Sequence, residues 1–307
     1  MYDYIYRESL KRAKHKIWIF SDLQQSEPDN AQKCLDVCME DFYHMGKSAD
    51  MIWFLGDCVE GTDITKLNKM CASLEEAFEK IDIPVCFVAG NHDLDYERYG
   101  EGGKNGVFVP FYETVKKHPN WHFAKSFDEP YFKVPVGDFM VYFFTDHIAP
   151  DKAWNTTHGI IHGDKTKYPH IEKLKKVKEE MAKESCPVIT ASHYSFIGGS
   201  RPSELFNNLL PLPENVKIHF YGHAHFGDFA WAGDSPYQRI SWVKMHDIPQ
   251  LNVSSFENIR GRKCRSVFLH IYEDNSLGVF FRNHDDKCFS ECYFPAKTTE
   301  VHKPMDK

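Results

Sequence analysis

Five short segments of this chain carry side chains that can bind a metal ion, and each follows a run of apolar residues. They are Asp22-Leu23-Gln24, Gly56-Asp57-Cys58-Val59-Glu60, Gly90-Asn91-His92-Asp93, His193 after Ala191-Ser192, and Gly222-His223-Ala224-His225. One His or Asp after a strand is common in ordinary loops, but five segments in the same local context form a specific pattern. Their carboxylate, amide and imidazole groups suffice for two metal ions. His92 is left over, which indicates an enzyme rather than a simple metal-binding protein.

The types of these residues suggest individual roles. Asp57 lies between a glycine and the next predicted helix, where a carboxylate can reach two cations or cap the helix N-terminus. The four companion segments favour the bridging role. Asn91 offers a neutral amide oxygen, although it also suits a left-handed turn. His223 and His225 alternate along the backbone, so on an extended chain they point to opposite sides and one can serve each metal.

The elements that must position these residues follow from the apolar pattern. Strands are predicted at residues 16–21, 51–55 and 84–89, with helices at about 30–47 and 64–81 between them. Strands that are apolar along their whole length predict a mainly parallel sheet covered on both faces. The pattern resumes with strands at 139–145, 188–191 and 216–221 and a helix at about 171–183. All five segments therefore lie at carboxyl ends of strands, where α/β sheets bind ligands.

The pattern of predicted elements changes in the last third of the chain. Short strands with turns between them are predicted at 229–231, 238–243, 250–253, 266–272, 278–282 and 288–294, and they suggest an antiparallel sheet. No linker rich in Pro, Gly or Ser separates this part from the rest. The expected fold is therefore a single α/β domain over residues 1–296, a layered α/β/β/α sandwich of two mixed sheets flanked by helices. Residues 297–307 are expected to form a flexible tail.

Composition limits the class of protein and its partners. The chain has 307 residues, 42% of them hydrophobic, which is typical of a globular protein. A formal net charge of -7 argues against a nucleic-acid polymer as partner, but it permits a small phosphorylated substrate. Residues 1–16 lack the apolar core of a signal peptide, and no apolar stretch approaches the roughly 20 residues that span a bilayer. The nine scattered cysteines favour reduced thiols and a cytoplasmic location.

The five segments resemble the calcineurin-like metallophosphoesterase superfamily, whose pattern is D-x-H, G-D-x-x-D, G-N-H-D/E, H and G-H-x-H. The resemblance covers roughly residues 16 to 226. It implies that one ion is held by Asp22, Gln24, Asp57 and His225, and that the other is held by Asp57 as a bridge, Asn91, His193 and His223. It also implies that His92 is the catalytic histidine that binds no metal, and that Glu60 orients it.

Two positions depart from the family pattern. Glu60 replaces an aspartate, which keeps the charge but lengthens the arm, so its pairing with His92 stays open. Gln24 replaces a histidine, and its amide oxygen is a harder and weaker ligand than imidazole. The expected cofactors are therefore two divalent ions, Mn²⁺ first, with Fe, Mg and Zn as alternatives. The same Asp-x-Gln variant occurs in the Mn²⁺-dependent ADP-ribose/CDP-alcohol diphosphatase branch, which this chain resembles at that position.

The expected reaction is hydrolysis of a phosphoester. Two cations about 3.5–4 Å apart lower the pKa of a shared water, and the bridging hydroxide attacks phosphorus in line. His92 would protonate the leaving oxygen or bind the phosphoryl group. Two loops follow the third and fourth segments and suit a base and a second phosphate, although ordinary flexible surface loops are the alternative; their candidate residues are Tyr96, Arg98, Tyr194 and Arg201.

These features favour phosphodiester or pyrophosphate bonds of a small nucleotide-like substrate. A phosphomonoesterase is the alternative among enzymes, because the five segments do not separate the two activities. A catalytically silent scaffold of the same fold is less favoured, because such a protein is expected to lack the equivalent of His92 or several ligands.

Overall fold

The computed structural model describes residues 1–25, 27–58, 64–93, 113–124, 130–145, 156–157, 160–161, 171–196, 205–225, 240–243, 248–258 and 263–295. The helices are α1 (Tyr2–Arg12), α2 (Pro28–His44), α3 (Ile64–Glu79) and α5 (Ile171–Lys183), with short 3₁₀ turns η1 (Asn91–Asp93) and η5 (Leu205–Leu209). The strands are β1 (Ala13–Phe20), β2 (Met51–Phe54), β3 (Val85–Phe87), β4 (Trp121–His122), β5 (Tyr131–Val136), β6 (Phe139–Phe144), β7 (Thr156–Thr157), β8 (Ile160–Ile161), β9 (Val188–Ser192), β10 (Val216–Tyr221), β11 (Ile240–Val243), β12 (Ile248–Asn252), β13 (Arg265–Tyr272), β14 (Leu277–Asn283) and β15 (Cys288–Tyr293).

Two mixed sheets form the centre of the fold. The first has the strand order β15-β14-β13-β1-β2-β3-β4, and the second has the order β11-β12-β10-β9-β6-β5. Strands β1 to β4 run parallel to one another, as do β6, β9, β10 and β12. The strands at the outer positions, β13 to β15 in one sheet and β5 and β11 in the other, pair antiparallel.

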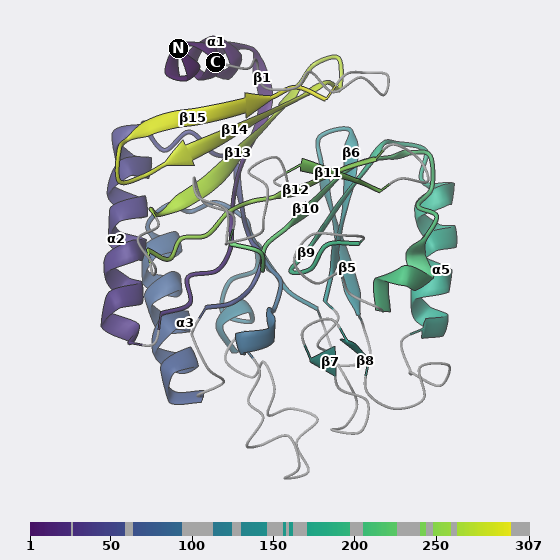
Figure 1. Ribbon diagram of the computed structural model, residues 1–307, viewed down its shortest axis with the longest axis horizontal. Helices are drawn as coiled ribbons and strands as arrows, with labels where there is room; N and C mark the ends of the chain where they lie inside the picture. The colour runs from purple at the N-terminus through teal and green to yellow at the C-terminus, as the bar shows by residue number, and fades with distance from the viewer. Residues whose placement is uncertain are drawn as a thin grey trace.

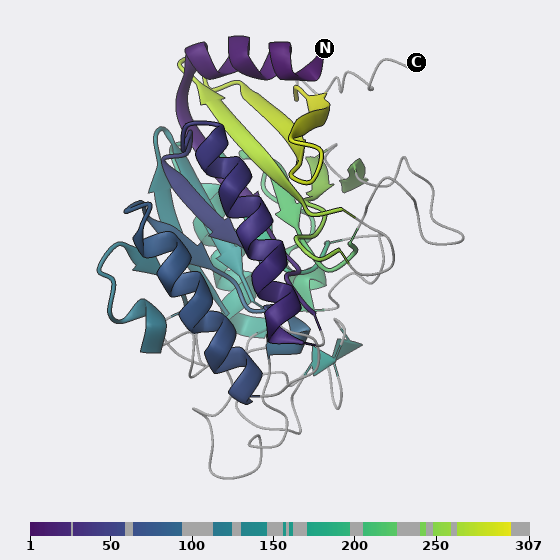
Figure 2. The same ribbon diagram turned by 90° about the vertical axis from the view of Figure 1, so that its left-hand side faces the viewer.

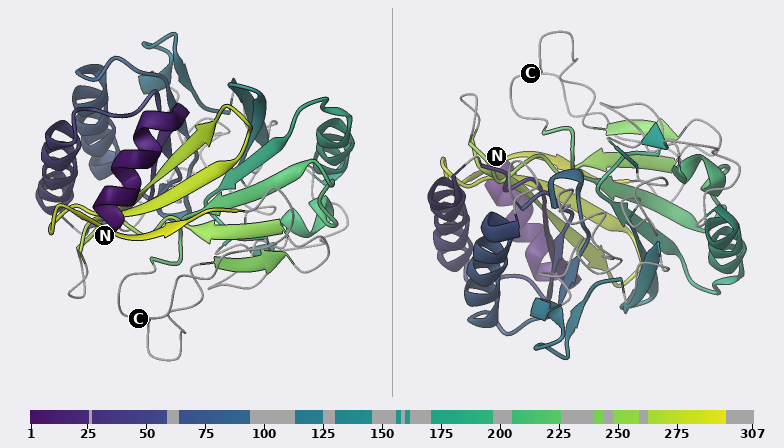
Figure 3. Two further views of the ribbon diagram at one scale, coloured as in Figure 1. Left: turned by 90° about the horizontal axis from the view of Figure 1, so that it is seen from above. Right: turned by 90° about the horizontal axis from the view of Figure 1, so that it is seen from below.

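The two sheets pack between helical layers. Helices α2 and α3 lie beside the first sheet and α5 beside the second, on opposite sides of the molecule (Figure 1). The views from above and below show the same order of helix, sheet, sheet and helix (Figure 3). This arrangement confirms the predicted layered α/β sandwich. None of the helices in the described ranges has the length and apolar character that crossing a bilayer requires.

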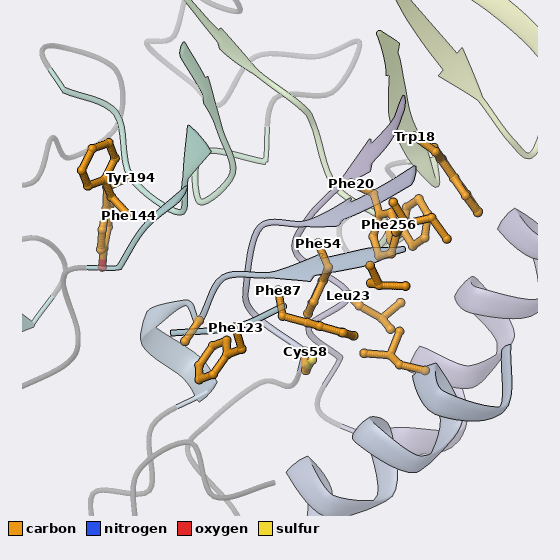
Figure 4. Close-up of a cluster of buried hydrophobic side chains, with 14 of the residues drawn as sticks. Trp18, Phe20, Leu23, Phe54, Cys58, Phe87, Phe123, Phe144, Tyr194 and Phe256 are labelled. Carbon is orange, nitrogen blue, oxygen red and sulfur yellow. The ribbon is translucent and has the colours of Figure 1, made fainter. Parts of the chain in front are cut away.

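Strand β1 shows how the sequence builds these layers. Because side chains alternate across a strand, Ile17 and Ile19 belong to one apolar cluster, between the sheets, while Trp18 and Phe20 belong to the other, on the helix side. The Trp18 ring stacks on Phe42 of α2 with ring centroids 4.4 Å apart. Phe20 stacks on Phe256 at 4.1 Å, beside Trp18 and Phe54 (Figure 4). Each buried ring adds roughly 1.5–3 kcal/mol of hydrophobic stabilisation, which holds the strand end in a fixed place.

The C-terminal third does not form the separate antiparallel sheet that the sequence predicts. Strand β12 pairs parallel with β10 and so extends the second sheet. Strands β13 to β15 instead continue the first sheet through antiparallel pairing of β13 with β1. The physical reason is that β1 has β2 on one side only, and its other edge needs hydrogen-bond partners. The strand predicted at 229–231 lies outside the described residues.

The structure adds a first helix that the sequence analysis did not predict. Helix α1 lies next to the C-terminal strands and contacts β13 and β15 (Figure 2). Its Tyr6 is buried and stacks on Phe289 of β15 with ring centroids 3.9 Å apart. A helix with few apolar residues gives a weak periodic signal, and here packing against β15 decides its conformation.

Candidate metal centre

The candidate ligands converge because parallel strands bring their carboxyl ends to one edge. Asp22 and Gln24 follow β1, Asp57 follows β2, and η1 follows β3, and these three strands are neighbours in the first sheet. His193 follows β9, while His223 and His225 follow β10, and these two strands are neighbours in the second sheet. The site therefore draws on both sheets.

Two groups of three side chains share one carboxylate. In each group the ligand atoms lie within 4.8 Å of one another; the groups are Asp57, His193 and His223, and Asp22, Asp57 and His225. Asp22 and Asp57 are fully buried, and His193 is only 1% exposed. A carboxylate common to both groups can bridge two cations, as the sequence analysis expects of Asp57. The structure thus brings these five predicted ligands together.

Hydrogen bonds tie the segments to one another. The backbone N–H groups of Asp22 and Leu23 donate to the carbonyl oxygens of Gly56 and Asp57, each at 2.9 Å. The backbone N–H of His223 donates to Asp22 Oδ2 at 2.9 Å, which joins the fifth segment to the first. His193 Nδ1 donates to the carbonyl of Leu55 at 2.7 Å across the two sheets. This bond leaves His193 Nε2 facing Asp57 Oδ2, 3.2 Å away.

Asp93 fixes the position of Asp57. Its buried carboxylate accepts hydrogen bonds from the backbone N–H groups of Asp57 at 2.8 Å, Cys58 at 2.7 Å and Gly90 at 2.8 Å. Burial and the nearby Asp57 raise the pKa of Asp93 to about 7, against the effect of these three bonds. Asp93 therefore joins the loops after β2 and β3 and does not face the ligand cluster.

Four of the ligand candidates adopt a backbone conformation that side chains usually avoid. The φ angles are 57° for Asp22, 60° for Asp57, 61° for His223 and 49° for His225. Such left-handed residues are uncommon outside glycine, and each is strained by about 1–3 kcal/mol. Residues of this kind cluster at functional sites, where the surrounding structure holds them in place. This conformation turns the backbone sharply at each of these residues, just past the end of its strand.

Two glycines allow the segments to approach closely. A Cβ atom on Gly90 would lie 2.1 Å from Asp57 Oδ1, and one on Gly222 would lie 2.0 Å from Ser21 Oγ and 2.8 Å from Asp22 Oδ2. Any side chain at either position would therefore push a buried carboxylate out of the cluster. This is the physical reason for the glycine in the third and fifth segments.

The electrostatics of the cluster are those of a cation site. Burial alone would raise the pKa of Asp57, but His193 and His92 outweigh it and hold the pKa well below its usual range. Burial alone would lower the pKa of His193, but Asp57 raises it to about 9. In His225 burial is likewise outweighed by Asp22 and Glu257, and the pKa rises to about 10. Because metals bind neutral imidazole, a divalent cation that binds here displaces ring protons.

The donor set fits divalent metal ions. Gln24 Oε1 is buried and has no hydrogen-bond partner within the described part of the chain, while the buried Asp57 Oδ2 has the His193 ring 3.2 Å away. A buried polar oxygen without a partner is destabilising, and a bound cation compensates it. Carboxylate and amide oxygens with imidazole nitrogens suit Mn, Fe, Zn or Mg. The residues present therefore fit two such ions. Gln24 lies beside Asp22 on the same loop.

Some of the remaining predicted residues lie in the described ranges, and others do not. His92 is partly exposed, and Asn91 lies in η1, although its side chain is not among those described. Tyr194 is fully buried, with its ring centroid 4.4 Å from that of His223. Its contact with substrate stays a prediction. The other predicted residues lie outside the described residues; they are Glu60, Tyr96, Arg98 and Arg201.

A further strand end contributes residues that the sequence analysis missed. Asn252, at the end of β12, donates from Nδ2 to the carbonyl of Gly222 at 2.5 Å. Glu257 is 1% exposed and lies with Oε1 2.9 Å from His225 Nδ1. The available signal was the same as for the other segments, namely polar side chains directly after an apolar strand. It was missed because this strand was assigned to a separate sheet.

Comparison with known proteins agrees with this geometry. A family model for calcineurin-like phosphoesterases matches residues 15–227. No curated protein matches the chain by sequence at a significant level. Among solved structures, a dimetal phosphatase from Danio rerio has a TM-score of 0.65 at 10% identity, covering 93% of this chain and 100% of that chain.

Two other solved structures have similar folds. A purple acid phosphatase from yellow lupin (Lupinus luteus) seeds has a TM-score of 0.54 at 13% identity, covering 91% of this chain and 53% of that one. A protein from Thermus thermophilus has a TM-score of 0.53 at 14% identity, covering 88% of this chain and 99% of that one. Identities this low show a common fold alone.

The family match spans all five segments and more than half of the chain. The chain therefore belongs to the calcineurin-like phosphoesterases, and it is a metal-dependent phosphoesterase of a family that uses a binuclear divalent metal centre.

Proposed function

We propose that this protein hydrolyses phosphodiester or pyrophosphate bonds of a small nucleotide-like molecule, using two divalent metal ions. The observation that carries the proposal is the pair of ligand groups that share the buried Asp57. Two divalent ions in such a centre supply an activated water and neutralise phosphoryl oxygens. The proposed ligands of the two ions are those that the family resemblance implies: Asp22, Gln24, Asp57 and His225 for one, and Asp57, Asn91, His193 and His223 for the other.

Manganese is the proposed metal because of Gln24. Its Oε1 is buried and has no hydrogen-bond partner in the described ranges, so it is available to a cation. An amide oxygen in place of imidazole favours Mn²⁺ or Mg²⁺ over Zn²⁺.

His92 is proposed to act on the phosphoryl group. Its backbone N–H donates to Asp57 Oδ1 at 2.8 Å, while its side chain is partly exposed. The backbone of His92 is thus anchored at the proposed bridging carboxylate, while its partly exposed side chain is accessible to a substrate. An imidazole in this place can protonate the leaving oxygen or hold the phosphoryl group.

The preference for a diester or pyrophosphate is supported by the Asp-x-Gln motif and by the aromatic and cationic residues of the two loops. A second phosphate or a base would bind away from the reacting phosphorus, and that binding would position the bond for attack. The proposed contacts are Tyr96, Arg98, Tyr194 and Arg201.

A substrate panel tests this proposal. The purified protein would be assayed with Mn²⁺, Mg²⁺, Zn²⁺ and Fe²⁺ against bis-p-nitrophenyl phosphate, p-nitrophenyl phosphate and a nucleoside diphosphate derivative. We expect the highest kcat/KM on the diester or the nucleotide, with Mn²⁺. Arg201→Ala should reduce activity on the nucleotide far more than on the small chromogenic ester. A preference of the unmodified enzyme for the monoester would instead support a phosphomonoesterase.

The bridging role has its own test in Asp57→Asn. This change removes charge from both proposed ion sites, so metal content and activity should fall together. Two ions per chain with normal turnover would contradict the role of Asp57.

A cytoplasmic location remains part of the proposal. It is supported by the nine cysteines, which are free thiols and mostly buried.

A further inference from the structure

Glu257 is a buried carboxylate in contact with a metal-ligand candidate. It is 1% exposed, and its Oε1 lies 2.9 Å from His225 Nδ1. The other ring nitrogen, Nε2, lies 3.0 Å from Asp22 Oδ1. The His225 ring thus lies between two carboxylates, one on each side. Among the described residues, the Asp22 side belongs to the two ligand groups that share Asp57, and Glu257 does not.

This arrangement determines which nitrogen of the ring can bind a metal. A carboxylate only accepts hydrogen bonds, so the Nδ1–H of His225 donates to Glu257. The neutral ring that binds a metal then carries its lone pair on Nε2, toward Asp22. A carboxylate behind a ligating imidazole also makes the imidazole more basic and fixes the ring plane.

The backbone holds Glu257 in this place. Its N–H donates to the carbonyl of Asp22 at 3.0 Å, and the preceding Phe256 N–H donates to Ser21 at 3.0 Å. Earlier in the same segment, Ser254 has a φ of 67°, and its N–H donates to Asn252 Oδ1 at 2.9 Å. Residues 252–257 are therefore fixed to the first segment and, through Asn252, to the fifth. These backbone bonds fix the place from which the Glu257 carboxylate reaches His225.

We propose that Glu257 is a positioning residue of the metal centre, which fixes the tautomer and ring plane of His225 and thereby strengthens binding of one ion of the pair. That ion is the one assigned to Asp22, Gln24, Asp57 and His225. The inference rests on the proposed binuclear centre. The second ion, assigned to Asn91, His193 and His223 with Asp57, uses no ligand that Glu257 contacts in the described part of the chain. Loss of the Glu257 carboxylate should therefore weaken binding of the ion that His225 holds more than binding of the second ion.

The experiment measures Mn²⁺ binding, independently of turnover. Wild type, Glu257→Gln and Glu257→Ala would be titrated with Mn²⁺ by calorimetry, and bound metal would be counted after dialysis. We expect one of the two sites in Glu257→Ala to weaken by about 10- to 100-fold while the other keeps its affinity. Glu257→Gln keeps an oxygen that accepts the Nδ1–H bond, so it should fall between Ala and wild type. At sub-saturating Mn²⁺, the electron paramagnetic resonance signal of Glu257→Ala should change from a coupled pair to a single ion.

Glu75→Gln is the matched control. Glu75 Oε1 contacts His118 Nε2 at the same distance of 2.9 Å, and this pair lies outside both ligand groups. The control should bind two Mn²⁺ ions as wild type does. Unfolding temperatures in the presence of chelator separate an effect on folding from an effect on the ion.

Three results would overturn the inference. Wild-type affinity at both sites in Glu257→Ala would show that the carboxylate does not act on His225. Equal weakening of both sites, with a lower unfolding temperature in chelator, would assign Glu257 a role in stability alone. Wild type that binds fewer than two ions would overturn the proposed binuclear centre, and this inference with it.

Discussion

The backbone and the side chain of His92 have separate tasks. Its N–H donates to Asp57 Oδ1 at 2.8 Å and so helps to hold the carboxylate that both ligand groups share. Its imidazole is partly exposed and is the one site histidine that the resemblance leaves free of metal. A substitution that keeps the backbone can therefore remove the proposed acid without disturbing Asp57.

We predict that His92→Ala retains both ions and loses turnover by roughly 10²- to 10⁴-fold. The hydrogen bond to Asp57 survives because alanine has the same backbone N–H. Metal analysis alongside kcat measurements checks this. A substrate with a very acidic leaving group should lose less, since it needs no proton. Loss of metal from the variant would mean that His92 is a ligand.

Gln24 gives the second prediction at the scale of a residue. Its buried Oε1 has no hydrogen-bond partner in the described ranges. Because imidazole binds Zn²⁺ better than an amide oxygen does, Gln24→His should raise the affinity for Zn²⁺ relative to Mn²⁺. Competition dialysis of wild type and variant measures this ratio. A native protein that keeps two zinc ions against chelator, and is most active with them, would contradict the argument from ligand hardness.

At the scale of elements, the site depends on how closely the strand ends approach. The loops after β2 and β3 meet where Gly90 lies against Asp57, and Asp93 joins the same loops through three backbone hydrogen bonds. The ends of β9 and β10 reach this place from the other sheet. Small displacements of a loop therefore move a ligand directly.

We predict that Gly90→Ala abolishes tight binding of both ions, because its Cβ would lie 2.1 Å from Asp57 Oδ1 and the shared carboxylate must move. Calorimetric titration with Mn²⁺ tests this. Gly46→Ala is the control: its φ is +80°, and an added Cβ meets nothing within 4 Å. This control should lose about 1–2 kcal/mol of stability from backbone strain while keeping its metal affinity. Equal metal affinity in the two variants would contradict the steric argument.

At the scale of the whole molecule, a buried polar network joins helix α2 to the C-terminal strand β14. Arg282 of β14 donates to Asp41 of α2 from Nε at 2.8 Å and from Nη2 at 2.7 Å. His284 Nδ1 donates to Asp41 Oδ2 at 2.8 Å, and Ser266 Oγ lies 2.6 Å from His284 Nε2. This row resembles a catalytic triad in spacing, but Ser266 and His284 are 0% exposed, and Ser266 also accepts a bond from Trp18. Its role is therefore structural.

We predict that Asp41→Asn lowers the free energy of unfolding at neutral pH by about 3–5 kcal/mol, because the buried Arg282 guanidinium loses its buried carboxylate partner and keeps the more exposed Asp3. Denaturant unfolding measures this. The matched control is Asp29→Asn on the same helix: its ion pair with Lys69 is exposed, so no measurable change is expected. A loss in Asp41→Asn no larger than in the control would contradict a stabilising role for the network.

The same pair determines a pH dependence. Burial alone would raise the pKa of Asp41, but hydrogen bonds from Arg282 and His284 lower it from 3.8 to about 2. Since the folded-state pKa is below the unfolded value, this stabilisation is complete above pH 3.8 and is lost as pH falls through about 2. The difference in stability between wild type and Asp41→Asn should shrink over this range.

Local patterns in the sequence were enough to predict much of the fold and most of the candidate site. Apolar runs predicted the central parallel strands, and the polar segments after them predicted that Asp22, Asp57, His193, His223 and His225 would meet. These five side chains do meet, because parallel strands place their carboxyl ends at one edge, while their binding of metal remains a prediction. The resemblance added roles for Gln24, Asn91 and His92, which remain predictions.

Only the tertiary structure placed β12 and the residues after it. Sequence periodicity shows that residues 250–253 form a strand, but it contains no information on which strand they pair with. The parallel pairing of β12 with β10 brings Asn252 and Glu257 to the metal-centre edge. In the same way, α1 and the pairing of β13 with β1 depend on contacts between residues far apart in the chain. Local composition determines the type of an element, whereas its neighbours depend on which open edges and apolar faces remain to be covered.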